Sequence, residues 1–266
     1  MTGSVGIAVA QFAPTADAEA NRASIQALAE RAASRGASVV LFPEYSSYFT
    51  DPFDATLAAN AEDLDGPFVQ ALTATAGRLG VHLVAGLTER ADDGRVRNTV
   101  VAVDGSGLVA RYRKQHLYDA FGQRESDWIE AGALDEPQTF EAGGLRFGLM
   151  TCYDLRFPEV ARTLADAGAD VALVPAEWVR GPLKEHHWTT LLTARAIENT
   201  MYVAAADHPP TLGVGHSAVI DPLGVTIAGI GTATDVAIGW ADPDTIRNVR
   251  RVNPALALRR YRVVPR

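Results

Sequence analysis

The sequence contains a single cysteine, Cys152, among its 266 residues. A lone thiol cannot form an intramolecular disulfide, which fits a reducing compartment. The N-terminal stretch also lacks the basic segment, apolar core and small-residue cleavage site of a secretory signal peptide. Both absences predict a cytoplasmic protein.

Positive charge is scarcer than negative charge. Lys and Arg number 24 against 32 Asp and Glu, which gives a formal net charge of -8 and a sequence pI near 5.2. This balance disfavours phosphate backbones and anionic membrane surfaces as partners. Charged residues also interrupt the apolar runs before they reach the roughly 20 residues of a membrane-spanning helix. We therefore expect neither a nucleic acid nor a membrane as partner.

Motifs for common cofactors are also missing. The first apolar strand is not followed by the Gly-x-Gly-x-x-Gly fingerprint of dinucleotide-binding proteins, and there is no P-loop. His186 and His187 are adjacent, so they lack the i, i+4 spacing of a helical zinc site. The sequence therefore predicts a protein without a metal or an organic cofactor.

The pattern of apolar residues indicates a layered α/β fold. Hydrophobic residues make up 47% of the chain and charged residues 21%, as in soluble globular proteins. The periodicity predicts strands at 5–12, 38–42, 81–87, 98–103, 108–112, 147–150, 171–174, 201–205, 217–220 and 225–228, and helices at 16–33, 67–79, 156–167 and 184–198. Strands alternate with helices at both ends of the chain and form hairpins between them. We therefore expect one domain, residues 1–266, with mixed sheets.

Three chemically capable side chains follow predicted strands. Cys152 follows strand 147–150, Glu44 follows strand 38–42 and Lys114 follows strand 108–112. Each alone has an ordinary explanation: an inert core cysteine, an acid in a turn, a solvated lysine. Together they could catalyse a reaction, because a carboxylate can remove the thiol proton and a cation can stabilise the oxyanion that forms when the sulfur attacks. The set predicts cysteine-dependent hydrolysis.

A histidine is the more usual partner of a catalytic thiol. The candidates are His82, His116, His186, His187, His208 and His216. The sequence alone leaves this alternative open.

Three segments resemble the glutamate, lysine and cysteine blocks of the nitrilase superfamily of carbon–nitrogen hydrolases, in the same order. They are Leu41–Tyr45, Tyr112–Leu117 and Gly148–Glu159. The resemblance implies an α-β-β-α sandwich that pairs across its helices into a dimer. It also implies that Glu44 is the general base, Lys114 the stabiliser of the anionic intermediate and Cys152 the nucleophile. A second glutamate that orients the lysine and the amide would be Glu125, with Glu130 as the rival.

Further segments resemble the branch of omega-amidases and deaminated-glutathione amidases. They are Tyr153–Pro158, His187–Trp188 and Ala194–Asn199. In that branch the arginine of the cysteine block helps to receive a substrate carboxylate, which implies this role for Arg156; the alternative is a salt bridge to Asp154 or Glu159. The chain departs from the branch in a shorter stretch from Lys114 to Glu125 and in Pro182–His186.

The expected function is hydrolysis of a small, carboxylate-bearing amide through a cysteine thioester, with release of ammonia. Nitrile hydrolysis and N-carbamoyl amino acid hydrolysis are alternatives that use the same residues, and a catalytically silent scaffold is a third. Tyr48, Tyr153, Arg156 and Trp178 are the expected substrate-binding residues. For Tyr48 and Trp178, simple core packing is the alternative.

The C-terminal segment, about 244–266, is rich in arginine. Its arginines alternate with the apolar residues Val252, Leu256, Leu258 and Tyr261. This pattern is typical of a segment packed on one side, and arginine pairs well with carboxylates at interfaces. We expect the segment to lie at the interface of a homodimer or larger homo-oligomer; a solvated tail is the alternative.

Overall fold

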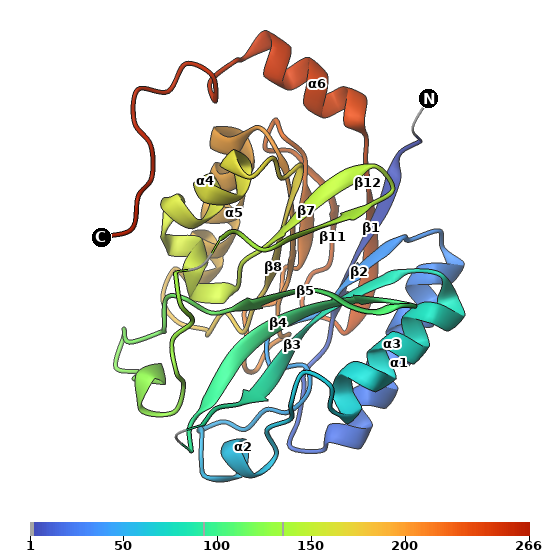
Figure 1. Cartoon of the computed structure of the whole chain (residues 1–266), viewed down its shortest axis with the longest axis vertical. Coiled ribbons are helices and arrows are strands. Elements are labelled where there is room, and N and C mark those ends of the chain that lie inside the picture. The colour runs from blue at the N-terminus through green and yellow to red at the C-terminus, as the bar shows by residue number, and fades with distance from the viewer. Residues whose placement is uncertain (1–2, 93, 135) are drawn as a thin grey trace.

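The computed structural model describes residues 3–92, 94–134 and 136–266. Figure 1 shows its elements coloured along the chain from blue to red. The strands are β1 Val5–Gln11, β2 Val39–Leu41, β3 His82–Arg90, β4 Val96–Asp104, β5 Gly107–Arg113, β6 Thr139–Ala142, β7 Leu145–Leu149, β8 Val171–Pro175, β9 Tyr202–Ala206, β10 Ala218–Ile220, β11 Thr226–Gly229 and β12 Asp235–Ala241. The helices are α1 Ala18–Ser34, α2 Thr56–Ala59, α3 Pro67–Leu79, α4 Pro158–Asp166, α5 Lys184–Asn199 and α6 Pro243–Val252.

The strands form two mixed sheets of the same design. The first has the order β12-β1-β2-β3-β4-β5 and the second the order β11-β10-β9-β8-β7-β6. In each sheet three neighbouring strands run parallel, β1-β2-β3 in one and β7-β8-β9 in the other, and antiparallel strands flank them. The sequence periodicity therefore predicted the mixed sheets correctly.

The main core lies between the two sheets. Because side chains alternate along a strand, Val5, Ile7 and Val9 of β1 face the second sheet and join its residues, such as Phe147 and Leu173, in one buried cluster. Strands buried on both faces read as continuous apolar runs, which explains why β1 was recognisable in the sequence.

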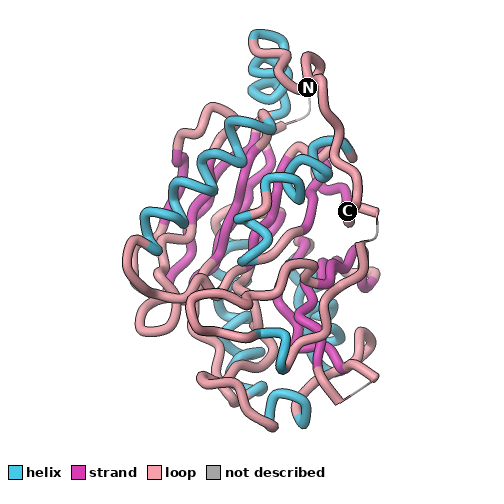
Figure 2. Tube along the Cα trace, turned by 90° about the vertical axis from the view of Figure 1, so that its left-hand side faces the viewer, coloured by secondary structure: helices cyan, strands magenta, loops and turns pink. Residues whose placement is uncertain are grey.

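Helices cover the outer face of each sheet. Ile25 of α1 and Leu72 of α3 pack against the first sheet, whereas Leu164 of α4 and Trp188 of α5 pack against the second. Figures 1 and 2 show the resulting four layers, with a helix pair on either side of the two sheets. The predicted α-β-β-α sandwich is confirmed.

Two predicted elements differ from the structure. The helix expected over 156–167 begins only at Pro158, because Phe157 before the proline is extended. Cys152–Arg156 instead forms a separate 3-10 turn. The C-terminal segment is also more ordered than expected, since α6 begins after the capping side chain of Asp242 and buries Ile246 against the core between the sheets.

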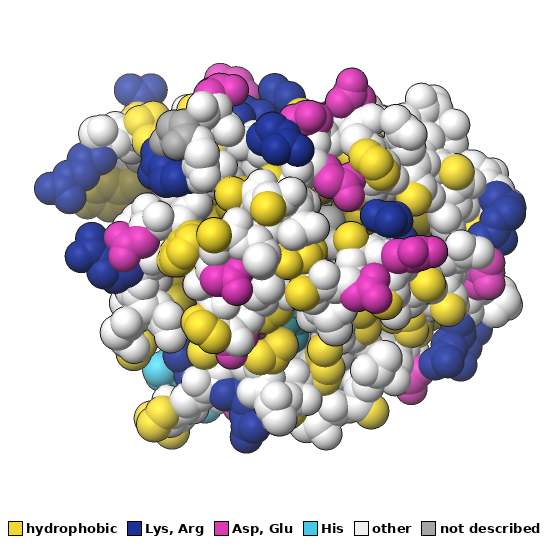
Figure 3. All heavy atoms as spheres, turned by 90° about the horizontal axis from the view of Figure 1, so that it is seen from below, with side chains coloured by type: hydrophobic (Ala, Val, Ile, Leu, Met, Phe, Trp, Pro, Cys, Tyr) yellow, Lys and Arg dark blue, Asp and Glu magenta, His cyan; other side chains and the backbone are white. Residues whose placement is uncertain are grey.

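None of the helices within the described ranges combines the length and the apolar character needed to cross a bilayer. Figure 3 views the end of the molecule where α2 lies, and acidic, basic and hydrophobic side chains are interspersed on this face.

Candidate active site

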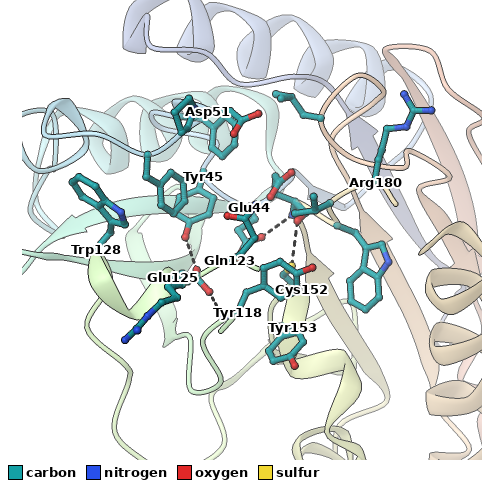
Figure 4. Close-up of a pocket in the computed structure, with 18 of the residues that line it drawn as sticks. Glu44, Tyr45, Asp51, Tyr118, Gln123, Glu125, Trp128, Cys152, Tyr153 and Arg180 are labelled. Atoms are coloured by element: carbon teal, nitrogen blue, oxygen red, sulfur yellow. Dashed lines mark hydrogen bonds between the residues drawn. The ribbon is translucent and has the colours of Figure 1, made fainter. Parts of the chain in front are cut away.

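A cavity of about 570 Å³ lies where strand ends of the two sheets meet. Glu44 follows β2 and Lys114 follows β5 in the first sheet, whereas Cys152 follows β7 in the second. The lining includes these three side chains together with Glu125, Tyr153 and Trp178. Figure 4 shows Glu44, Glu125 and Cys152 directed toward one common space. The fold thus brings together residues as far apart in the sequence as Glu44 and Trp178.

Glu44 is almost completely buried, with 1% of its surface exposed. Its Oε1 accepts hydrogen bonds from Lys114 Nζ at 2.9 Å and Asn98 Nδ2 at 2.6 Å, and its Oε2 accepts one from the backbone N–H of Glu177 at 2.7 Å. Burial raises the pKa of Glu44, and the nearby Glu125 carboxylate adds to this against the attraction of Lys114. The side chain is therefore a better proton acceptor than an ordinary glutamate.

Glu125 holds the other side of Lys114. Its carboxylate accepts hydrogen bonds from Lys114 Nζ at 3.0 Å, Tyr45 Oη at 2.6 Å and the backbone N–H of Tyr118 at 2.6 Å. Burial works against its charge, but the Lys114 ammonium and these hydrogen bonds lower the pKa of Glu125. Burial likewise opposes the charge of Lys114, yet the Glu125 and Glu44 carboxylates raise its pKa well above the ordinary value.

The rival glutamate lies elsewhere. Glu130 forms an ion pair with Arg97 and is absent from the cavity lining. Of the two candidates that the sequence offered, the structure brings only Glu125 to Lys114.

Cys152 is held in an unusual backbone conformation. Its φ is +43°, in the left-handed region, at the start of the 3-10 turn. The side chains of Thr151 and Asp154 form a reciprocal capping box around the turn. Asp154 is fully buried and also accepts hydrogen bonds from Tyr112 Oη at 2.8 Å and the backbone N–H of His116 at 3.1 Å. The segment that carries Lys114 is thus tied to the turn that carries the thiol.

The thiol itself faces acidic groups. Cys152 Sγ donates a hydrogen bond to the backbone carbonyl of Glu177 at 3.4 Å. Burial, followed by the Glu44 carboxylate, raises the pKa of Cys152 well above its ordinary value, although Lys114 works in the opposite direction. The resting group is a thiol, so attack requires a base to remove its proton.

The expected substrate-binding residues are distributed unevenly. Tyr153 and Trp178 line the cavity. Tyr48 does not; it is buried, and its hydroxyl donates to Thr56 Oγ1 at 2.8 Å. The structure therefore gives Tyr48 the packing role that was the alternative.

Arg156 does not line the cavity but contacts Trp178, which does. Its guanidinium carbon sits 4.8 Å from the Trp178 ring centroid, and Nη2 is 3.3 Å from His187 Nδ1. Within the described part of the chain it forms no salt bridge to Asp154 or Glu159. Its Nε is buried and has no hydrogen-bond partner there.

No described residue that lines the cavity is a histidine. His208 is buried next to the site, but its Nε2–H donates to the backbone carbonyl of Glu44 at 2.8 Å, and burial lowers its pKa to about 4. His116 contacts Asp154 and stacks on Phe157. The described residues also contain no group of three or more His, Cys, Asp or Glu placed to hold a metal ion.

Sequence reasoning missed Tyr45, Asn98 and Glu177. Tyr45 adjoins Glu44, and Asn98 is a buried polar residue in β4 shortly before its apolar run Val100–Val103, so both carried a faint signal. Glu177 follows β8 as Glu44 follows β2 and lines the cavity, yet it belongs to none of the three blocks. Burial, Glu44 and Asp207 raise the pKa of Glu177 well above its ordinary value.

Comparison with known proteins identifies the family. Residues 6–251 match the model of the carbon–nitrogen hydrolases. The chain belongs to this family. Among similar proteins, a deaminated glutathione amidase from Escherichia coli O157:H7 is 40% identical over 256 residues, which cover 96% of this chain and 97% of that one.

Solved structures share the fold of this carbon–nitrogen hydrolase. Nit3 of Saccharomyces cerevisiae, a member of branch 10 of the nitrilase superfamily, superposes with a TM-score of 0.85 at 25% identity and covers 97% of each chain. An amidase from Nesterenkonia sp. AN1, solved as a double mutant with acrylamide, has a TM-score of 0.83 at 25% identity and covers 98% of this chain and 95% of that one. The resemblance seen in the sequence is confirmed, and the protein is a hydrolase.

Proposed function

We propose that this carbon–nitrogen hydrolase is an amidase that acts through a thioester on Cys152. The observation that carries the proposal is the position of Lys114, whose Nζ donates hydrogen bonds to Glu44 at 2.9 Å and to Glu125 at 3.0 Å in the cavity that Cys152 also lines. Glu125, whose pKa is lowered, stays ionised and holds Lys114, whereas Glu44, whose pKa is raised, can take up and return a proton. Carboxylates whose environments push their pKa values apart are typical of acid–base pairs in active sites.

The first half of the reaction forms the acyl-enzyme. Glu44 removes the proton of Cys152 as the sulfur attacks the amide carbon. An ammonium group has three N–H donors, so Lys114 can hold both carboxylates and still donate one to the developing oxyanion. When the intermediate collapses, the C–N bond breaks and Glu44 gives its proton to the departing nitrogen, which leaves as ammonia.

The second half releases the product. Glu44, again ionised, removes a proton from a water molecule that attacks the thioester carbon. The C–S bond then breaks, the thiolate regains its proton from Glu44, and the carboxylic acid leaves. Nitriles and N-carbamoyl amino acids would use the same groups. A silent scaffold is disfavoured because it would have no need to keep Lys114 buried between two carboxylates.

The proposed substrate is a small amide that carries a carboxylate. The guanidinium of Arg156 beside the cavity wall supports an anionic substrate, and the similarity to proteins named deaminated glutathione amidase supports an amide. The cavity volume of about 570 Å³ also favours a second candidate, an amide with a larger amine as leaving group.

The test combines product analysis with trapping of the intermediate. The protein is mixed with succinamate, quenched within seconds and weighed by intact-protein mass spectrometry while ammonia is measured in parallel. We expect a transient mass increase equal to the acyl group. Cys152→Ala and Glu44→Gln should release no ammonia above background, whereas the matched control Glu130→Gln should keep the rate. Turnover by folded Cys152→Ala would contradict the covalent mechanism.

A further inference from the structure

Lys184 is an unusual lysine in the cavity wall. It is the first residue of α5, only 5% of its surface is exposed, and it lines the cavity that contains Cys152. Its Nζ donates a hydrogen bond to Tyr118 Oη at 2.8 Å. The same nitrogen lies 4.7 Å from the Tyr118 ring centroid, 4.8 Å from that of Phe121 and 5.3 Å from that of Trp178. Aromatic rings thus surround a side chain that normally extends into water.

A second cation lies beside it. The Arg156 guanidinium contacts two of the same rings, at 5.5 Å from the Phe121 centroid and 4.8 Å from the Trp178 centroid. Burial, together with the positive charge of Arg156, lowers the pKa of Lys184. Two neighbouring cations in a partly desolvated wall repel each other, so this arrangement is unfavourable without a nearby negative charge.

No acidic side chain among residues 3–92, 94–134 and 136–266 forms an ion pair with Lys184 or Arg156. Two acids, Glu177 and Asp207, raise the pKa of Lys184 from a greater distance, but neither forms an ion pair with it within the described residues. Burial and its acidic neighbours raise the pKa of Glu177. Asp207 accepts hydrogen bonds from the backbone N–H groups of Trp178, Val214 and Gly215. Within the described part of the chain, neither Lys184 nor Arg156 therefore has an acidic side chain in direct contact.

We propose that Lys184 binds the carboxylate of the substrate at the end remote from the scissile amide, with Arg156 strengthening the positive field from behind the aromatic rings. Lys184 takes the direct role because it lines the cavity and Arg156 does not. Both Lys184 and Cys152 line the cavity, so a carboxylate held by Lys184 would fix the orientation of an amide whose carbon faces Cys152. The inference rests on the proposed amidase activity and adds the residue that selects its substrate.

The kinetic test compares charged and neutral amides of equal length. Glutaramate and pentanamide are assayed for ammonia release with the wild type, Lys184→Met and Lys184→Arg. Lys184→Met should lower kcat/KM for glutaramate about 10- to 100-fold, the range expected for one charge-assisted hydrogen bond. It should change kcat/KM for pentanamide less than about threefold, and Lys184→Arg should recover part of the glutaramate activity. An equal loss for both amides would overturn the proposal.

Arg180 provides the comparator. It also lines the cavity, but its side chain is exposed, and Figure 4 shows it directed away from Cys152. Arg180→Met should therefore affect glutaramate much less than Lys184→Met does. If both variants lose the same activity, the general charge of the cavity and not Lys184 selects the substrate, and the assignment is wrong.

A binding measurement separates this inference from the amidase proposal. Glutarate, the dicarboxylate product, is titrated calorimetrically into Cys152→Ala and into Cys152→Ala with Lys184→Met. We expect at least tenfold weaker binding to the second protein. Weak and equal binding to both would refute the role of Lys184 even if amides are hydrolysed. If the wild type hydrolyses no amide but Lys184 controls glutarate binding, the amidase proposal fails and the anion site stands. Lys184→Gln replaces the methionine variant should that protein not fold.

Discussion

At the scale of single residues, the site depends on a buried lysine between two glutamates. Lys114 and Glu44 are exposed by only 2% and 1%. Breaking a buried ion pair by removing one partner typically destabilises a protein by about 3–5 kcal/mol, because it leaves a charge without compensation. The proposed catalytic residues therefore also contribute to the stability of the fold.

We expect Glu125→Gln to lower both stability and activity. Lys114 would keep only Glu44 as a counterion, so the loss should approach about 3 kcal/mol, or roughly 6–12 °C in Tm for a chain of this size. Since the folded pKa of Glu125 is lowered, its contribution is present above pH 4.5 and is lost as the pH falls. The Tm difference from the wild type, followed by calorimetry, should shrink as the pH is lowered further below 4.5. Glu130→Gln, which breaks a more exposed ion pair, should change stability by less than about 1 kcal/mol.

Glu177 should have the opposite effect. Its pKa is raised in the folded protein, so the folded state holds the proton more tightly than the unfolded state does, and stability falls as the pH rises above 4.5. Glu177→Gln removes this loss. Its Tm should exceed that of the wild type at pH 8, by about 2–4 °C for each kcal/mol regained, and should equal it near pH 4. The exposed Glu185→Gln is the control; a Tm for Glu177→Gln below that of the wild type at pH 8 would contradict the assignment.

The main reactive residues of this site could be predicted from the sequence, but most of their contacts could not. Glu44, Lys114 and Cys152 could be predicted because each follows an apolar strand and lies in a recognisable block. Tyr48 could not be separated from Tyr45, because only the three-dimensional turn decides which ring faces Glu125. Lys184 could not be singled out either, since nothing near it in the sequence shows that α5 would bury its first residue.

At the scale of elements, the 3-10 turn Cys152–Arg156 is the critical one. It places a non-glycine residue at positive φ, which is strained and persists only where the surroundings hold it. Asp154 supplies much of this support, through the backbone of Thr151 and through Tyr112 and His116.

Asp154→Asn should loosen this turn. The amide cannot accept all the hydrogen bonds that the carboxylate accepts, so we expect kcat to fall at least tenfold and stability to fall by about 1–3 kcal/mol. Steady-state kinetics with succinamate and thermal unfolding measure both effects. The exposed Glu159→Gln at the start of α4 serves as the matched control. Unchanged kcat in Asp154→Asn would show that the turn holds its shape without this carboxylate.

Helices and strands could be predicted where their own residues are clearly apolar. They were missed where their burial depends on segments far away in the sequence. Strands such as Val171–Pro175 are apolar throughout and were evident. Asp235–Ala241 was not predicted, because its residues are only partly buried and its partner β1 lies more than 200 positions earlier. Helix α6 was not predicted because it is rich in arginine and has little apolar pattern. Pro243 and Ile246 are its only buried residues.

At the scale of the molecule, the segment after α6 leaves apolar side chains in solvent. Leu258 is 70% and Tyr261 92% exposed, and Figure 1 shows this segment running along the outside of the molecule beside α4. Exposed apolar side chains near the α4–α5 face are typical of an interface. We propose that the segment packs against a second copy of the chain in a homodimer.

Leu258→Ser combined with Tyr261→Ser should weaken that dimer. Because both side chains are exposed in the single chain, the substitutions should leave the monomer fold intact. Sedimentation velocity over a range of concentrations should show a dimer for the wild type and at least tenfold weaker association for the variant. Leu134→Ser, at an exposed site in another loop, controls for general loss of apolar surface. An unchanged sedimentation profile would favour the solvated tail. Truncation after Pro243 is less informative, because it also removes the buried Ile246.

The position of β1 within its sheet has a consequence for how the chain is made. β1 pairs with β2 on one side and with β12 on the other, with Val5 opposite Ala241. During synthesis β1 therefore cannot pair with its second neighbour until more than 200 further residues have been added to the chain. Until then the nascent chain keeps an apolar strand edge unpaired, which invites association with other chains and with chaperones. Since such distant pairing is slow, folding of the first sheet should be completed only after β12 has left the ribosome.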